Sequence, residues 1–349
     1  MIFASDNWSG ASERVIAALA EAARKGGPAY GDDELTKGVT ARFSETFERE
    51  VAVFLVASGT FANLLSLAAY ARPGGIILGH RESHINVDEA GGAEFVTGGS
   101  KIVALEAEQG KITPEALEPI LSRPIHGYHS GQLTTLSLTQ LTELGAAYSV
   151  EEVTALAKLA KGAGLAVHMD GSRFANAIAA TGATPAEMTW KAGVDVLSFG
   201  GTKNGCLAAE AVVFFDKAHA RDAGFIRQRA GQGFSKNWFL AAQILAYLER
   251  GHWLDLARHA NAMAARLAGA LRSARRARLA FEPAGNELFA IVENGLDEKL
   301  RAAGAVYYPW PADSLPVAER PEPGETMIRL LTSWQTKVEE VERFADLVG

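Results

Sequence analysis

The chain of 349 residues contains one cysteine, Cys206, so no disulfide can form within it. Small secreted domains usually depend on several disulfides, whereas cytosolic proteins keep their thiols reduced. A reducing, cytoplasmic location is therefore the simplest expectation. The opening residues MIFASDNWSG lack a basic region and a long apolar stretch, so we expect no signal peptide.

Long hydrophobic runs and an excess of positive charge are also missing. Nowhere do about 18 apolar residues follow one another, so we expect no transmembrane helix and no membrane partner. The formal net charge is −7, and no run of lysine or arginine is present. Such a chain is a poor candidate for binding the phosphates of nucleic acid, and a small-molecule ligand is the better expectation.

Strands and helices alternate from about residue 50 to residue 215. Short β-branched runs such as VAVFLV and LAVHMD are followed by Gly or Ser and then by helical periodicity. One such helix, SVEEVTALAKLAKGAG, begins at Ser149 with the spacing of a capping box to Glu152. The alternation predicts an α/β fold with a mainly parallel sheet of the seven-stranded type, covered by helices on both faces.

The pattern changes after AEAVVFFD, where Ala-rich helices dominate to about residue 275. The segments LAFEPAGNELFAIVE, AGAVYYPWP and TMIRLLTSW then have strand character, and a proline-rich loop precedes the last of them. A chain of this length is long for one core. We predict a large domain over residues 1–255, including the N-terminal segment, and a smaller C-terminal α+β domain over residues 256–349.

The segment Ser58-Gly59-Thr60 lies between an apolar strand and a predicted helix. The free N–H groups and the positive dipole end of a helix N-terminus attract phosphate, and the two hydroxyls could add donors. A plain N-cap in a tight turn explains the same residues, and the spacing of a Walker loop is absent. The segment is therefore a candidate phosphate site, with a helix cap as the alternative.

The stretch HMDGSRF ends a predicted strand at Asp170, at the sheet edge where ligands bind in open α/β folds. An ionised Asp at this place can keep the pyridine nitrogen of a cofactor protonated. Arg173 follows three residues later and offers a planar fork for a carboxylate. A helix-capping Asp followed by a surface Arg is the alternative.

Another predicted strand, VDVLSF, runs into Gly200-Gly201-Thr202-Lys203. A lysine just beyond a buried strand is partly desolvated, which favours the neutral amine that a Schiff base needs. The glycines permit unusual backbone angles and the close approach of a cofactor. Thr202 is either a phosphate contact or a turn residue, and Lys203 could instead be an exposed turn lysine. Cys206 is expected to pack rather than react, because no His lies near it in sequence.

His84 lies in the predicted loop HRESHINVDEAGG. Its imidazole could stack on a flat cofactor ring, although most single histidines are satisfied surface or core residues. His80 and His84 form an HxxxH pair without further ligands nearby, so no metal site is expected. Each of these segments alone is a weak signal. Their order along an α/β chain predicts a cofactor site.

The chain resembles the threonine aldolase family of fold-type-I pyridoxal-phosphate (PLP) enzymes over most of its length. The resemblance rests on SDNWSGAS, AYGDD, SGTFANLLSL, ESHINVDEAGGAE, LSLTQLTELGAAYS, HMDGSRFANA, SFGGTKNG, NAMAARLA and IRLLTSW. It implies an aspartate-aminotransferase-like fold with PLP as cofactor. It also implies retro-aldol cleavage of L-threonine or L-allo-threonine to glycine and an aldehyde.

The resemblance also implies a role for individual residues. Lys203 would form the Schiff base with PLP, and His84 and His126 compete as the base that removes the β-hydroxyl proton. Tyr30 could reach the site of a neighbouring subunit. The expected cofactor contacts are Ser58, Gly59, Thr60, His84, Asp170, Arg173, Thr202 and Lys203, and the expected substrate contacts are Ser5, Tyr30, Arg173 and Arg329. This chain has Thr139-Gln140 where many members carry an Asn-Thr pair.

Other functions fit parts of the same pattern. A β-eliminating lyase would use the same scaffold on an amino acid with a leaving group at Cβ. A non-enzymatic nucleotide-binding protein would use only the Ser58–Thr60 turn, and a non-catalytic interaction domain would need a peptide groove that the sequence does not indicate. The resemblance further implies a homo-oligomer, a dimer or a homotetramer, with sites at the subunit interface.

Overall fold

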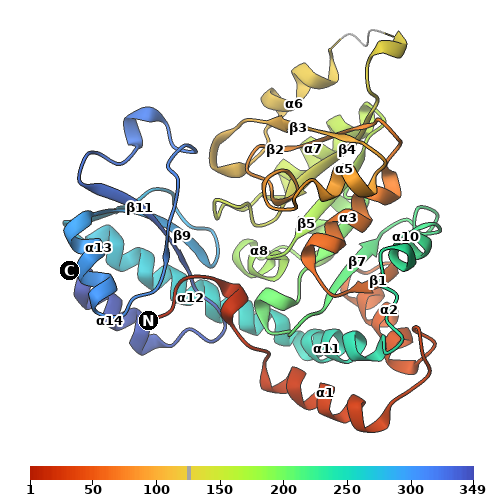
Figure 1. Ribbon diagram of the computed structural model, residues 1–349, viewed down its shortest axis with the longest axis horizontal. Helices are drawn as coiled ribbons and strands as arrows, with labels where there is room; N and C mark the ends of the chain where they lie inside the picture. Colours follow the sequence, from red (N-terminus) through yellow and green to blue (C-terminus); the bar gives the residue numbers. More distant parts are fainter. Residues whose placement is uncertain (124–126) are drawn as a thin grey trace.

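The computed structural model describes residues 1–123 and 127–349 and contains two sheets (Figure 1). The larger sheet has seven strands in the order β1-β7-β6-β5-β4-β2-β3, and the smaller has four in the order β10-β11-β9-β8. The predicted combination of a mainly parallel α/β sheet with a smaller α+β unit is confirmed. Within the two described ranges, none of the helices combines the length and the apolar character that a membrane crossing requires.

The strands of the large sheet follow the apolar runs of the sequence. They are β1 (Ala52–Val56), β2 (Ile76–His80), β3 (Lys101–Leu105), β4 (Leu133–Thr139), β5 (Ala166–Gly171), β6 (Val196–Phe199) and β7 (Glu210–Phe214). The strands β3, β2, β4, β5 and β6 run parallel, whereas β7 pairs antiparallel with both β6 and β1. Every residue of β6 and β7 is buried, as expected for strands that helices cover on both faces.

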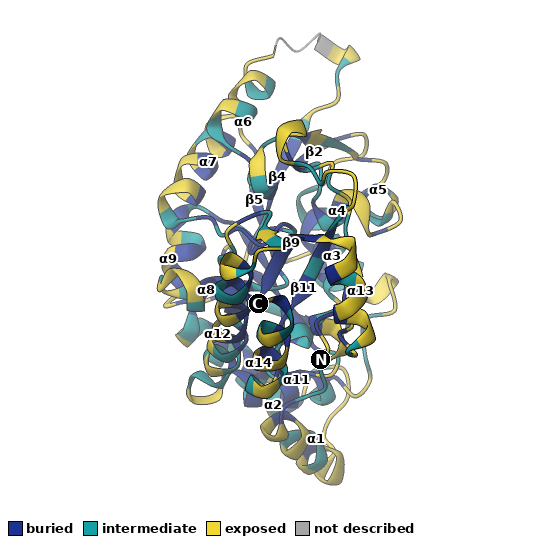
Figure 2. Cartoon of the chain, turned by 90° about the vertical axis from the view of Figure 1, so that its left-hand side faces the viewer, coloured by how far each residue is buried: buried dark blue, intermediate teal, exposed yellow. Residues whose placement is uncertain are grey.

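Helices pack on both faces of this sheet, with their outer sides exposed (Figure 2). They are α1 (Glu13–Lys25), α2 (Glu34–Thr46), α3 (Gly59–Tyr70), α4 (His84–Val87), α5 (Gly92–Val96), α6 (Pro114–Leu121), α7 (Val150–Gly162), α8 (Phe174–Thr181), α9 (Pro185–Met188), α10 (Ala223–Arg229) and α11 (Trp238–Leu248).

The predicted capping box is confirmed, because Ser149 and Glu152 each accept a hydrogen bond from the other's backbone N–H. The predicted loop around His84 contains one short helix, α4, and leads into another, α5, with Gly91 between them in a left-handed conformation with φ 72°.

The smaller unit has its own apolar core. It comprises β8 (Ala277–Leu279), β9 (Glu287–Glu293), α13 (Asn294–Ala302), β10 (Tyr308–Pro309), β11 (Glu325–Leu331) and α14 (Val338–Val348). Phe3, Leu288, Ile328 and Phe344 are completely buried in its core. The segment AGAVYYPWP forms only a two-residue strand. The prolines in this segment limit the strand, because proline has no N–H to donate to a sheet.

Two segments connect the two units. The long helix α12 (His252–Ser273) packs against α8 and α11 at one end and against β8, β9 and α14 at the other (Figure 1). The N-terminal strand segment pairs with the small unit through Phe3, whose N–H donates to the carbonyl of Val306 at 2.8 Å. A boundary between residues 255 and 256 falls inside α12 and stays a prediction.

The topology gathers the predicted site segments at one edge of the large sheet. Because β7 is antiparallel to both β1 and β6, these two strands point the same way, and β5 is parallel to β6. The turns that follow β1, β5 and β6 therefore emerge at the same edge. These turns carry Ser58–Thr60, Asp170–Arg173 and Gly200–Lys203.

Candidate active site

Asp170 is a buried carboxylate at the end of β5, and its two oxygens accept three hydrogen bonds. Asn63 Nδ2 donates to Oδ2 at 2.7 Å, while the backbone N–H and the hydroxyl of Ser172 donate to Oδ1 at 3.0 and 2.7 Å. Burial acts to raise the pKa of Asp170, but the charge of His84 and the hydrogen bonds from Ser172 outweigh it and hold the pKa below its usual value. Asp170 caps no helix, since the N-cap of α8 is Arg173. The helix-cap alternative is wrong, and Asp170 is a preorganised anion.

A chain of side chains connects His84 with Asp170. His84 Nδ1 lies 2.8 Å from Glu89 Oε1, and Asn63 Nδ2 donates to the same oxygen at 2.9 Å while also bonding to Asp170. The hydrogen bond that the His84 ring donates to the Glu89 carboxylate is the main reason why the pKa of His84 is raised. With Nδ1 held by a carboxylate, only Nε2 remains to accept or deliver a proton. Glu89 and Asn63 were missed by the sequence reasoning, although Glu89 follows His84 by five residues.

Lys203 lies in the 3-10 turn η5 (Thr202–Asn204), directly after β6. The turn is held by Glu210, whose Oε2 accepts from the N–H of Gly201 at 2.7 Å; burial raises the pKa of Glu210 to about 7. The hydroxyl of Thr202 accepts from the N–H of Ala209 at 3.3 Å, which favours the role of a turn residue. Its contact with a phosphate stays a prediction.

The amine of Lys203 is half-buried and close to several acids. Its charge influences the pKa values of Asp6, His84, Glu210 and Glu287. Nevertheless, among the residues that the structure describes, Nζ has no hydrogen-bond or ion-pair partner. A primary amine in this setting is free to react with a carbonyl carbon.

The two glycines before Lys203 allow close packing of the backbone. A Cβ on Gly200 would lie 2.4 Å from the carbonyl oxygen of Ser172, and one on Gly201 would lie 2.5 Å from that of Ala209. Gly201 has an ordinary φ of −119°, so the expectation of unusual backbone angles is wrong there. The absence of a side chain lets the lysine turn lie against the turn that carries Asp170.

The Ser58–Thr60 segment forms the start of α3. The hydroxyl of Ser58 accepts from the N–H of Phe61 at 3.2 Å, so the helix-cap interpretation is confirmed. The amides of Gly59 and Thr60 occupy the first helical positions, whose N–H groups have no acceptor within the helix. A Cβ on Gly59 would lie 3.5 Å from the hydroxyl of Ser172, so these amides are adjacent to the Asp170 turn. The cap thus leaves the free donors of a phosphate site in place.

A cluster of charges occupies the side toward the small unit. Nε and Nη2 of Arg173 donate to the two oxygens of Asp6 at 2.8 and 3.2 Å, and Nη1 lies 3.1 Å from Glu287 Oε2. Burial acts to lower the pKa of Arg173, but the two acids raise it overall. Arg173 is largely covered, with 11% of its side chain exposed, rather than a surface residue. Ser5 lies next to Asp6, and its hydroxyl accepts from the N–H of Asn7 at 3.1 Å.

Arg329 reaches the same cluster from β11. Its Nη1 lies 3.7 Å from Glu287 Oε1, and its guanidinium lies over the ring of Trp310 at 4.2 Å. Ser5, Arg173 and Arg329, three predicted substrate contacts from distant parts of the sequence, are therefore brought together around Asp6 and Glu287. The sequence reasoning did not identify either of these acids.

Glu143 is a further acid beside the site that the sequence did not reveal. Its Oε1 accepts from the backbone N–H of His84 at 2.7 Å and from the hydroxyl of Thr139 at 3.0 Å. Burial, reinforced by the charge of Asp170, raises the pKa of Glu143 to about 7. Gln140 instead points into the core, where its amide donates to the carbonyl of Tyr148 at 2.9 Å. Of the Thr139-Gln140 pair, only Thr139 is connected with the site.

Several predicted residues do not join this group. Tyr30 lies on an exposed loop, where its N–H donates to the carbonyl of Ser235 at 2.9 Å. His126 lies outside the described residues. His80 is engaged by the carbonyl of Ala107 at 3.0 Å and by the N–H of Glu82 at 3.1 Å. Cys206 is buried, which raises the pKa of its thiol, and this fits the expected packing role.

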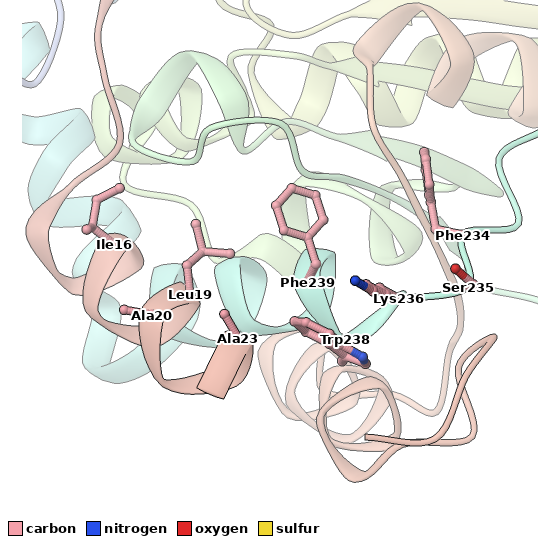
Figure 3. Close-up of a pocket in the computed structure, with 9 residues that line it drawn as sticks. All are labelled: Ile16, Leu19, Ala20, Ala23, Phe234, Ser235, Lys236, Trp238 and Phe239. Carbon is pink, nitrogen blue, oxygen red and sulfur yellow. The ribbon is translucent and has the colours of Figure 1, made fainter. Parts of the chain in front are cut away.

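An apolar groove of about 660 Å³ lies elsewhere, between α1 and α11 (Figure 3). Its lining residues are Ile16, Leu19, Ala20, Ala23, Phe234, Ser235, Lys236, Trp238 and Phe239. None of them is a predicted site residue or a member of the charge networks described above. The groove is therefore separate from the chemistry around Lys203.

Comparisons with known proteins point to one family. The model of the family described as Beta-eliminating lyase matches residues 3–294. The Low specificity L-threonine aldolase of Pseudomonas aeruginosa is 38% identical over 343 residues, which cover 98% of this chain and 95% of that protein. The protein of the same name from a Pseudomonas sp. strain is 36% identical with the same coverage. A solved structure of a Leishmania major threonine aldolase matches with a TM-score of 0.91 and 26% identity over 99% of this chain and 98% of that one.

Replacing Gly200 by Ala should destabilise the protein by about 1–3 kcal/mol, because the new Cβ overlaps the backbone of Ser172. Urea-induced unfolding followed by circular dichroism measures the change. Gly162→Ala is the matched control, since a Cβ at this helical position meets nothing within 4 Å, and it should be neutral or slightly stabilising. Equal stability of the two variants would contradict the close-packing argument.

Replacing Glu89 by Gln should lower the pKa of His84. The carboxylate favours the protonated imidazole, so its removal makes the ring lose its proton at lower pH. The other groups acting on His84 are Asp170, Lys203 and, through the backbone, Glu143. NMR titration of the imidazole checks the shift. Asp88→Asn, at the exposed acid beside Glu89, is the control; an unchanged His84 titration in Glu89→Gln would rule out the coupling.

Proposed function

This chain belongs to the beta-eliminating lyase family and, within it, to the family of the low-specificity L-threonine aldolases, and on that premise we propose that it is a PLP-dependent aldolase. It cleaves L-threonine and L-allo-threonine to glycine and acetaldehyde. The observation that carries this proposal is the amine of Lys203, which has no hydrogen-bond or ion-pair partner among the described residues and lies at the sheet edge that also holds the ionised, buried Asp170.

The residues at this edge suit the chemical groups of PLP. A primary amine suits its aldehyde, an anionic carboxylate suits its pyridine nitrogen, and free helix N–H groups suit its phosphate. Lys203, Asp170 and the Ser58–Thr60 turn supply these three functions, and the imidazole of His84 lies within the electrostatic reach of Asp170. When bound, PLP supplies the electron sink that accepts the bonding pair from Cα. Asp170 would keep the pyridine nitrogen protonated for that purpose.

The remaining residues position the substrate and move its proton. Arg329, with Arg173 and Ser5, would hold the α-carboxylate and thereby fix which bond at Cα is cleaved. His84 would accept the β-hydroxyl proton at Nε2, because its Nδ1 is held by Glu89. His126 remains the competing base. The arginines lie beside their acids Asp6 and Glu287, which are close enough to Lys203 to feel its charge. Such a cluster supports an amino-acid substrate over the nucleotide-binding alternative, which gives Lys203 no role.

Acetaldehyde release tests the proposal. The PLP-loaded protein should release it from L-threonine, from L-allo-threonine or from both, and alcohol dehydrogenase with NADH measures it. Lys203→Ala should reduce turnover to the background rate, whereas Lys217→Ala, at an exposed lysine paired with Glu50, should not change it. Wild-type rates in Lys203→Ala would refute the assignment. Release of 2-oxobutanoate and ammonia in place of glycine and acetaldehyde would identify a β-eliminating lyase, because elimination of the hydroxyl keeps all four carbons of threonine together.

We further propose that the chain acts as a homo-oligomer, a dimer or tetramer, in the cytoplasm. The apolar groove between α1 and α11 supports a second copy, because a monomer rarely exposes a contiguous apolar surface of this kind (Figure 3). Tyr30 is 65% exposed and its backbone bonds to Ser235, which lines that groove. A copy bound there would come close to Tyr30, in agreement with its expected role at a neighbouring site. The single, reduced cysteine fits the cytoplasmic location.

Replacing Ile16 by Glu should therefore reduce the oligomer to a smaller species, since the side chain is 42% exposed in one chain and lines the groove. Light scattering coupled to gel filtration measures the mass. Val317→Glu, at an apolar residue that is 80% exposed far from the groove in sequence and fold, is the matched control. An Ile16→Glu variant with the wild-type mass would exclude this groove as the contact.

A further inference from the structure

Glu287 is a buried acid placed between the two arginines that the proposed function assigns to the substrate. It is the first residue of β9, and its side chain is 1% exposed. Its Oε2 lies 3.1 Å from Nη1 of Arg173, and its Oε1 lies 3.7 Å from Nη1 of Arg329. The group that these arginines would bind in a substrate is also a carboxylate. Glu287 therefore offers them the same chemistry from within the chain.

The two arginines are bound unequally. Arg173 is held by Asp6 through two hydrogen bonds, which fix its guanidinium whatever Glu287 does. Among the described residues, Arg329 has no such partner: its distance to Glu287 is at the long end for an ion pair, and its guanidinium otherwise lies over the rings of Trp310 and Tyr308. Arg329 is therefore the arginine that can exchange one carboxylate for another.

The pair between Arg329 and Glu287 is also incompletely satisfied. Within the described part of the chain, the buried atom Arg329 Nε has no hydrogen-bond partner, and Glu287 Oε2 makes no hydrogen bond either, although it forms an ion pair with Nη1 of Arg173 at 3.1 Å. Buried polar atoms without partners cost free energy, and a second carboxylate at Arg329 would supply the missing acceptor. Burial raises the pKa of Glu287 and lowers that of Arg329, so neither charge is well stabilised by its surroundings.

We propose that Glu287 is a specificity-determining residue that competes with the α-carboxylate of the substrate for Arg329. The inference rests on the proposed function, in which Arg329 binds that carboxylate. On binding, Arg329 leaves Glu287 for the substrate, while Arg173 stays with Asp6. The internal competitor weakens the binding of every amino acid and leaves ligands without an α-carboxylate unaffected. To bind, the carboxylate of a substrate must attract Arg329 more strongly than Glu287 does.

Glu287→Gln tests this competition, because it removes the charge with little change of shape. In the PLP-loaded enzyme, KM for L-threonine should fall by about five-fold, the scale of one partly exposed ion pair, with kcat within about two-fold. The dissociation constant of glycine, measured by calorimetry, should fall in parallel. The affinity for L-threoninol, an amino alcohol that lacks the α-carboxylate, should not increase.

Two variants accompany it. Glu293→Gln makes the same change at the other end of β9, where the acid pairs with Arg276 at the surface, and should leave KM unchanged. Glu287→Asp keeps the charge but is one methylene shorter, which lengthens a contact with Arg329 that already measures 3.7 Å. Its KM should lie between those of the wild type and Glu287→Gln.

An unchanged or lowered affinity for glycine in both Glu287 variants would overturn the proposal. So would an equal gain in affinity for L-threoninol, since it would show a general change of the pocket. Failure of both variants to fold, seen by circular dichroism, would make Glu287 a structural residue and would also overturn it. If the wild type releases no acetaldehyde, the proposed reaction fails, while glycine calorimetry still decides the role of Glu287.

Discussion

The buried negative charge of Asp170 is the constraint on which the site depends. A carboxylate inside a covered sheet is costly unless hydrogen bonds and opposite charges compensate it. The compensation comes from Asn63 on α3, from Ser172 in the following turn, and from the charge of His84. These contacts form only if the elements that carry the partners lie close to Asp170. The start of α3 must lie against the strand-end turn, and the α4 loop must fold back over it.

Further from Asp170, other charged side chains are paired in the same way. Glu89 links His84 to Asn63, while Asp6 and Glu287 neutralise Arg173 between the N-terminal segment, the large sheet and the small unit. Replacing such buried ion pairs by apolar residues often costs no stability, so stability alone does not explain them. Their placement around Lys203 fits the proposed function, in which the site holds a cofactor and the carboxylate of an amino acid in a fixed orientation.

Much of the fold could be read from the sequence, because strands and helices depend on local patterns. The apolar runs and the glycines that follow them marked the strands of the large sheet, and the capping box at Ser149 marked a helix start. The loop predicted around His84 is instead partly helical, since α4 begins at His84 itself. The strand expected in AGAVYYPWP is limited to two residues, because prolines have no N–H to donate. Asp170 and Lys203 could be proposed because each follows a strand directly.

The sequence by itself determined the fold class, the family and the residues that carry a strand-end signal. Only the tertiary structure decided which acids surround them, since no local pattern distinguishes Asp6, Glu89, Glu143 and Glu287 from other acids, and elements far apart in the chain bring them to the site. It also decided that Arg173 is committed to Asp6 whereas Arg329 is loosely held. The physical reason is that charge compensation in a buried site is a matter of distance in space. The local sequence pattern around a residue does not specify which distant residues will lie close to it.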